Sequence, residues 1–212
     1  SIFGTDIDPD SVRAARLVLL LTFIGNSRGP VAVPAGREEI RKAAESLVSS
    51  VRCGNALIAP DYFTGRQVHP FNADERRRVN AFSWQDAFPE IIPSGGFDVV
   101  IGAPPPYHPF VIRTREDYFQ THYGSYAEGA GLYTYFTERA LSLVRPGGRI
   151  AFLVPAPFLR SETARPFRRL ILTRRILQIT DTGRNSILQD GDARMYILSL
   201  ANEPPGGSFE VM

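Results

Sequence analysis

The chain has 212 residues, a length that suits one domain, or one domain with insertions. Hydrophobic residues make up 43% and charged residues 22%, which excludes a disordered or fibrous protein, and the single cysteine, Cys53, excludes a disulfide scaffold. The net charge of +2 does not by itself indicate nucleic-acid binding, and the most apolar run, around residues 17–24, is too short to cross a bilayer.

Strands and helices alternate from the start of the chain. The first residues predict a short buried strand that ends in acids, and Asp8 is placed to cap a helix that runs to about Phe23. Pro9 fits the first position of that helix, where no backbone N–H is needed. A polar helix over 38–51 and a second strand over 51–58 follow.

The middle of the chain is less regular. Residues 59–93 have no clear periodicity, and we interpret them as an insertion. Within them, the charge run 74–78 indicates the solvated face of a helix. A buried strand over 97–102 comes next, and residues 132–144 then predict a helix.

The last third continues the alternation. It predicts a strand over 149–154, a helix over 162–172 and two closing strands over 175–180 and 194–200. Strands that alternate with helices are typical of an α/β protein with a mostly parallel sheet, covered by helices on both faces.

Ligands of such sheets bind beyond the carboxyl ends of the strands, where this sequence places Asp6, Asn55 and the turn after Gly102. An acid between a strand and a helix can accept hydrogen bonds from both ribose hydroxyls of an adenosine cofactor, and Asp6 is placed for this role. A nicotinamide dinucleotide would use the same acid, and a solvated acid without a ligand is the other alternative.

The turn A-P-P-P-Y, residues 103–107, is more informative. Three consecutive prolines after a buried strand neither continue a sheet nor begin an ordinary helix, so they hold an extended backbone whose carbonyls lack ladder partners. Tyr107 adds a flat ring. Such a turn suits the binding of a planar group that carries an amine, and a stiff surface loop is the alternative.

The proline turn and several other segments resemble the motifs of one family. F-D-V-V-I-G-A-P-P-P-Y resembles the F-D-x-I-x-G-N-P-P-Y signature of adenine-specific DNA methyltransferases, which act on the exocyclic amine. G-T-D-I-D-P resembles their acidic second motif, and residues 131–155 resemble their stretch from [D/N]-L-Y through the fifth strand. R-R-I-L-Q-I-T-D with A-R-M-Y-I-L-S-L resembles their closing antiparallel pair, and F-S-W-Q-D-A-F-P-E-I-I is similar to a segment of large restriction–modification and phage-defence members.

The resemblance implies a Rossmann-like class I methyltransferase fold with an antiparallel closing strand. We expect residues 1–212 to be a partial methyltransferase domain cut from a larger protein, without the first strand, the Gly-rich loop and the target-recognition domain. The implied cofactor is S-adenosylmethionine, and the implied partner is double-stranded DNA with a flipped adenine. A cytoplasmic location without membrane or metal partners is expected.

In the family, an asparagine oxygen and a proline carbonyl each accept one hydrogen of the adenine amine, and the flipped base stacks on an aromatic ring. Carried over to this sequence, Ala103 stands at the asparagine position, and Pro104 and Pro105 supply the carbonyl. Tyr107 is the stacking aromatic by residue type, although Pro106 aligns with that position by count.

Several of these positions depart from the family pattern. Ala103 offers no side-chain acceptor, Gly131 replaces the Asp or Asn before Leu-Tyr, and Leu188 stands where the family often has a base-stacking Phe. The departures predict that the isolated chain is inactive, either because it is degenerate or because Ala103 was introduced deliberately.

The resemblance also implies cofactor-binding residues. Asp6 and Ile7 would hold the adenosine. For its adenine amine there are two candidates: Asn55, followed by Ala56 in C-G-N-A-L, and Asp86 in W-Q-D-A-F, whose separation from the proline turn is closer to that of compact members. We favour Asn55 because the segment that holds Asp86 is interpreted as part of the insertion.

Other functions remain open. A degenerate scaffold would bind DNA or a partner protein, and turns of the N-P-P-Y type also serve methyltransferases that act on protein or RNA. A nicotinamide-dependent enzyme is disfavoured because the proline turn has no role in hydride transfer. His69, His108 and His122 do not share the spacing of metal ligands, so no metal site is predicted.

Overall fold

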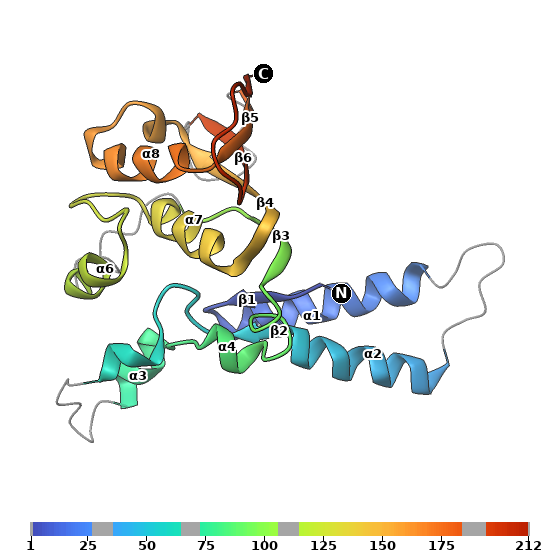
Figure 1. Cartoon of the computed structure of the whole chain (residues 1–212). Coiled ribbons are helices and arrows are strands. Elements are labelled where there is room, and N and C mark those ends of the chain that lie inside the picture. Colours follow the sequence, from blue (N-terminus) through green and yellow to red (C-terminus); the bar gives the residue numbers. More distant parts are fainter. Residues whose placement is uncertain (1, 27–35, 65–72, 106–114, 184–193, 212) are drawn as a thin grey trace. The chain divides into compact units, whose positions relative to one another are not determined.

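A computed structural model describes residues 2–26, 36–64, 73–105, 115–183 and 194–211 (Figure 1). The chain divides into two compact units, Ser1–Pro89 and Glu90–Met212. Each unit is described by itself below.

The first unit is built on a small parallel pair of strands. β1 (Gly4–Asp6) pairs with β2 (Val51–Cys53), with Asp6 opposite Cys53. Between them the chain forms α1 (Pro9–Asn26) and α2 (Arg37–Ser50), which pack against each other (Figure 1). Both helices match the predicted ones within a few residues.

The second strand is shorter than predicted. It ends at Cys53 rather than continuing to Ile58, because the Asn55 side chain accepts a hydrogen bond from the Leu57 N–H at 3.0 Å and turns the backbone away from a ladder. Beyond Cys53, the described residues show one isolated parallel bridge, which joins Asn55 to Ala81.

The predicted insertion contains short helices. They are the 3-10 helix η1 (Pro60–Phe63), α3 (Ala73–Val79) and α4 (Trp84–Ala87). The charge run lies on α3, where the three arginines of the run are exposed and Val79 is buried, so the prediction of a solvated helix face is confirmed. Edge-to-face contacts among four rings join the α4 region to the start of the chain: Phe3, Phe82, Trp84 and Phe88.

The second unit contains a five-stranded sheet in the order β3-β4-β6-β5-β7. Its strands are β3 (Phe97–Gly102), β4 (Val144–Pro155), β5 (Arg175–Asp181), β6 (Met195–Ala201) and β7 (Glu210–Val211). β3 is parallel to β4, β5 is parallel to β7, and β6 is antiparallel to both of its neighbours. The prediction of a mostly parallel sheet with an antiparallel closing strand is confirmed.

β4 begins five residues earlier than predicted. Val144 pairs with Phe97, and the pairing shifts register before Arg149 lies opposite Val99. The Pro-Gly-Gly segment between these two positions therefore forms an irregularity within the strand.

Helices complete the second unit. They are α6 (Glu116–His122), α7 (Leu132–Leu143), the 3-10 helices η2 (Ala156–Leu159) and η3 (Glu162–Ala164), and α8 (Arg165–Leu172). Side chains of α7, α8 and the central strands form the apolar core, which includes Tyr133, Ile150, Phe152, Phe167 and Leu198. Within the described ranges, no helix combines the length and the apolar character that a membrane span needs.

Candidate functional site

The carboxyl end of β1 carries the first predicted cofactor residue. Asp6 is exposed at the last position of the strand, and its Oδ1 accepts the Asp8 N–H at 2.8 Å. Among the described residues, no contact to the other carboxylate oxygen is seen. Ile7 follows with 47% of its surface exposed. An acid and an exposed apolar side chain therefore lie next to each other at the strand end.

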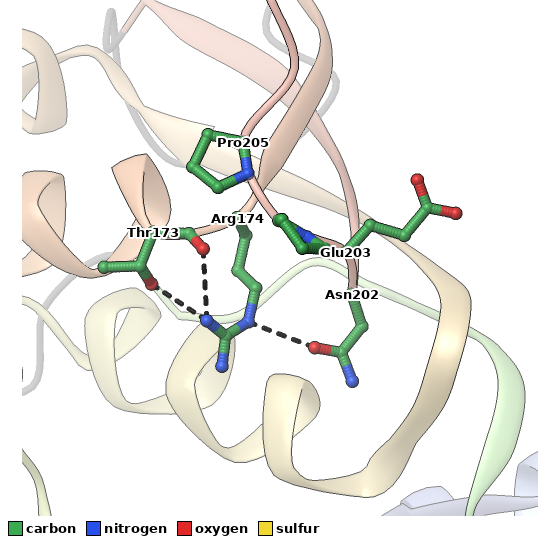
Figure 2. A pocket seen from close by; sticks show the side chains of 6 residues that line it. Thr173, Arg174, Asn202, Glu203 and Pro205 are labelled. Atoms are coloured by element: carbon green, nitrogen blue, oxygen red, sulfur yellow. Dashed lines mark hydrogen bonds between the residues drawn. The ribbon is translucent and has the colours of Figure 1, made fainter.

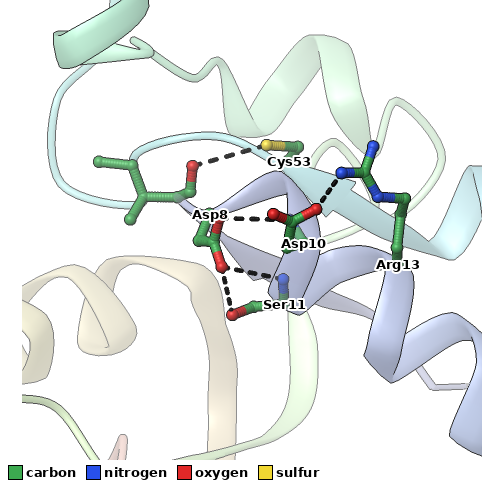
Figure 3. Close-up of polar contacts among 6 residues, drawn as sticks. Asp8, Asp10, Ser11, Arg13 and Cys53 are labelled. Atoms are coloured by element: carbon green, nitrogen blue, oxygen red, sulfur yellow. Dashed lines mark hydrogen bonds and ion pairs between the residues drawn. The ribbon is translucent and has the colours of Figure 1, made fainter.

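Asp8 caps the helix that follows, as predicted. Its Oδ2 accepts the Ser11 N–H at 3.0 Å and the Ser11 hydroxyl at 2.7 Å, and Oδ1 accepts the Asp10 N–H (Figure 3). The bonds from Ser11, with the Asp10 N–H, hold the pKa of the Asp8 carboxyl below its ordinary value. Asp8 is thus committed to the helix, and Asp6 is the acid that remains available at this end.

A residue that the sequence did not suggest lies beside Ile7. Asn80 donates from Nδ2 to the Ile7 carbonyl at 3.2 Å and to the Cys53 sulfur at 3.4 Å. Its φ of +47° lies in the left-handed region, which asparagine tolerates better than most residues. Asn80 therefore fixes the backbone on which Asp6 and Ile7 are carried, and its position before an apolar residue gave no signal of this in the sequence.

Asn55 is buried rather than open to solvent. Its Nδ2 donates to the Val79 carbonyl at 3.1 Å, and its Oδ1 accepts the Leu57 N–H at 3.0 Å, while 9% of the residue is exposed. The Asn55 amide therefore stabilises its own turn. One lone pair of Oδ1 remains, since an amide oxygen accepts two hydrogen bonds.

Asp86, the second candidate for binding the adenine amine of the cofactor, has a different environment. Asp86 is exposed on α4, and its N–H donates to the Ser83 hydroxyl at 3.2 Å. Ala56, beside Asn55, accepts the Trp84 indole N–H on its carbonyl at 3.0 Å. Trp84 therefore packs within the first unit.

The proline turn begins at the end of β3 in the second unit. Gly102 pairs with Phe152 of β4, and a Cβ on Gly102 would meet the Phe152 ring at 3.2 Å. After it, Ala103 is exposed, Pro104 is buried and Pro105 is exposed. Pro104 thus anchors the turn in the protein while the residues on both sides of it remain accessible. Tyr107 and Pro106 lie outside the described residues, as does Leu188.

Gly131, which stands where the family has Asp or Asn, caps α7 through its backbone alone. Its carbonyl accepts the Thr134 N–H at 3.1 Å and the Thr134 hydroxyl at 2.9 Å. Gly131 itself therefore offers no polar side chain for a ligand at the start of α7. In the same helix, burial raises the pKa of Tyr133 to about 12, so its phenol stays protonated at neutral pH.

A pocket of about 280 Å³ lies at the amino ends of the parallel strands of the second unit, away from the proline turn. It is lined by residues at the start of β5 and the end of β6: Thr173, Arg174, Asn202, Glu203, Pro204 and Pro205 (Figure 2). Arg174 donates from Nε to Asn202 Oδ1 at 3.1 Å, and Asn202 donates to the Val144 carbonyl at the start of β4. Because the parallel strands begin here and end at the other edge, this pocket is not part of the predicted site.

Possible metal ligands do not cluster in the described part of the chain. No group of three or more His, Cys, Asp or Glu side chains there could hold a metal ion. Of the three histidines, His122 stacks on Tyr118, with ring centroids 3.9 Å apart, and the other two lie outside the described residues.

Comparison with known proteins gives a family match over most of the chain. The family model described as Eco57I restriction-modification methylase matches residues 1–187. No curated protein matches.

The chain is also similar in fold to solved structures, including two with a TM-score above 0.5. The chain is similar to LlaBIII, an ATP-dependent Type ISP restriction-modification enzyme bound to DNA, with a TM-score of 0.56 and 12% identity over 99% of this chain and 14% of that one. It is similar to DrdV in a DNA complex, with a TM-score of 0.54 and 16% identity over 99% and 21%. For the M protein of the Type I restriction enzyme EcoKI, the TM-score is 0.49 and the identity 16% over 94% and 30%. The chain spans 30% or less of the length of these three proteins.

Proposed function

Because this chain belongs to the Eco57I restriction-modification methylase family, we propose that it forms the central part of a domain that methylates the amino group of adenine in DNA. The observation that carries the proposal is the turn Ala103–Pro105, anchored by buried Pro104 at the carboxyl end of a parallel strand. Ligands of this fold class bind at that edge. The expected cofactor is S-adenosylmethionine, and the expected partner is duplex DNA with one adenine flipped out.

The residues at the end of β1 fit the adenosine part of this cofactor. Asp6 presents an exposed carboxylate with one oxygen engaged by the Asp8 N–H, so the other is available to ribose hydroxyls. Ile7 offers an exposed apolar surface against which an adenine ring can pack. Asn55 would accept the adenine amine on its remaining lone pair, while its existing bonds to Leu57 and Val79 keep it in place.

The turn in the second unit would act on the target adenine. When bound, S-adenosylmethionine supplies an electrophilic methyl group. A carbonyl of Pro104 or Pro105 would accept one hydrogen of the adenine amine and orient its nitrogen, while Tyr107 would stack on the flipped base. Orientation of this kind lowers the barrier because the reacting groups are held in place before the reaction.

Ala103 removes one of the two acceptors that such a turn can provide. Its methyl side chain is exposed and accepts no hydrogen bond, so the second hydrogen of the amine has no partner from this position. The loss of one preorganised polar group at a reacting centre typically slows a reaction on the order of 100- to 1,000-fold. We therefore propose that the chain as found transfers methyl groups slowly or not at all.

Ala103 also supports a second candidate function. A domain that keeps its fold but lacks this acceptor would serve as a scaffold that binds DNA or a partner protein without methylating either. The two candidate functions predict different results for Ala103→Asn, which restores the acceptor. A methyltransferase would gain activity, and a scaffold would not.

The test is label transfer from tritiated S-adenosylmethionine by the full-length protein, both unaltered and with Ala103→Asn. Duplex DNA, RNA and protein are offered in parallel, and nucleosides are then separated to locate the label. We expect the Ala103→Asn protein to label DNA, in N6-methyladenine. Label in RNA or protein would instead favour another substrate class, and no label in any substrate would favour the scaffold.

A further inference from the structure

The residues between β4 and β5 carry most of the excess positive charge of this chain. Residues 160–174 contain five arginines and one acid, whereas the net charge of all 212 residues is +2. This charge is concentrated on one helix and the segments that flank it.

The helix α8 separates its arginines from its apolar side chains. Phe167 and Ile171 are buried in the core of the second unit, which fixes the orientation of the helix. Arg165 and Arg169 are exposed and lie four residues apart, so they follow each other along one face at a rise of about 6 Å. Two guanidinium groups therefore stand in a row on the solvent side of α8.

A third exposed arginine, Arg160, precedes the helix, and two partly buried hydrogen bonds hold its segment in place. Arg168 donates from Nη1 to the carbonyls of Phe158 at 3.1 Å and Ser161 at 2.7 Å. These carbonyls flank Arg160, so the segment that carries Arg160 is tied to α8. We name Arg160, Arg165 and Arg169 the α8 arginine surface.

The α8 arginine surface is not neutralised by neighbouring acids. The ion pairs of the second unit, as far as it is described, join Arg145 to Asp98, Arg175 to Glu203 and Arg194 to Asp181. None of them includes a member of the surface. The first unit shows the contrast, because Arg41 pairs with Glu38 and Glu45, and Arg77 pairs with Asp74, each within one helical turn.

The surface begins at the same edge of the sheet as the proline turn. Gly102 at the end of β3 pairs with Phe152 of the parallel strand β4, which runs directly into η2 and then Arg160. α8 starts at this edge and leads back to the start of β5, which runs in the same direction as β4. The positive surface is thus continuous with the edge at which the target adenine is proposed to bind.

We infer that the α8 arginine surface binds phosphates of the duplex DNA whose adenine is presented to the Ala103–Pro105 turn. The inference rests on the proposed function for its choice of partner. Guanidinium groups match phosphate oxygens with two parallel hydrogen bonds, and charges repeated along a helix face suit the regularly spaced charges of a DNA strand. Contacts of this kind position a duplex without reading its sequence.

The experiment measures the affinity of the full-length protein for a labelled duplex by fluorescence anisotropy at several salt concentrations. The test variant is R165Q/R169Q, and the matched control is R41Q/R77Q, which removes the same charge from arginines that acids already neutralise. We expect the test variant to bind on the order of 10- to 100-fold more weakly at 0.1 M salt. Its slope of log affinity against log salt should fall by about 2, because each phosphate contact contributes about 0.9. The control should keep the slope of the unaltered protein.

A second variant separates charge from folding. R165K/R169K keeps both charges and should keep most of the salt slope, and the melting temperatures of all variants are compared. Equal slopes for R165Q/R169Q and R41Q/R77Q would overturn the inference, as would displacement of the duplex by polyglutamate of equal charge. Methyl transfer to DNA by the Ala103→Asn protein together with equal slopes would overturn the inference alone. A reduced slope without methyl transfer by the Ala103→Asn protein would overturn the proposed function alone.

Discussion

The ring of Phe82 lies directly over Gly54, so closely that a Cβ on this glycine would come within 2.3 Å of a ring carbon. This contact joins the end of β2 to the segment before α4. Gly54 also donates its N–H to the Asp6 carbonyl at 2.8 Å. The close approach therefore supports the strand end that carries the proposed ribose-binding acid.

A methyl group at Gly54 should destabilise the first unit. We expect Gly54→Ala to lower the free energy of unfolding by roughly 1–3 kcal/mol, because the ring or the backbone must shift to make room. Chemical denaturation measures the effect. Gly25→Ala is the matched control, since a Cβ on Gly25 meets nothing within 4 Å and alanine is the better helix former.

The same contact predicts coupling between the two positions. In a background with Phe82→Leu, the cost of Gly54→Ala should be smaller than in the unaltered protein, because the side chain that causes the overlap is gone. An equal cost in both backgrounds would place its cause elsewhere.

How far the sequence predicts this structure depends on how local each signal is. The strand Phe97–Gly102 and the closing pair β5 and β6 follow from short apolar runs, and the Asp8 cap follows from a motif of four residues. The contact of Phe82 with Gly54 joins residues far apart in the chain, as does the bond from Asn55 to the Val79 carbonyl. No local pattern encodes such contacts, so the way the end of β2 is held within the first unit could not be predicted.

The residues of the candidate site also differ in whether a local sequence signal predicts them. Asp6 and the proline turn could be found from their places at strand ends, since this depends on strand order alone. The role of Asn80 could not, because its left-handed backbone and its bond to the Ile7 carbonyl exist only in the folded unit.

The cap of α1 gives a prediction about acidity. The pKa of Asp8 is lowered chiefly by the hydrogen bond from the Ser11 side chain, so Ser11→Ala should raise this pKa toward its ordinary value. NMR titration of the carboxyl carbons measures it, with Ser49→Ala as a control on α2. Since the folded pKa lies below the unfolded one, the stabilisation is present above about pH 4 and is lost as the pH falls through the folded value. An unchanged pKa in Ser11→Ala would contradict this cause.

The tyrosines predict the behaviour of the protein in alkali. Burial raises the pKa of Tyr123 and Tyr133 to about 12, and a hydrogen bond to Glu116 raises that of Tyr126 to about 12. These folded values exceed the unfolded value of about 10, so the stabilisation is complete below pH 10 and is lost as the pH rises toward 12. Phenolate absorbance follows the titration. Glu116→Gln should lower the pKa of Tyr126 but not that of Tyr133, and a shift in neither would contradict the assignment.

We propose that the turn after β3 orients an adenine amine through oxygen acceptors. The most direct measurement compares kcat for DNA methylation by the full-length protein carrying Ala103→Asn or Ala103→Leu, two side chains of similar size of which only asparagine accepts a hydrogen bond. We expect the kcat of Ala103→Asn to exceed that of Ala103→Leu and of the unaltered protein on the order of 100- to 1,000-fold. Equal kcat values in all three proteins, with DNA binding intact, would contradict it.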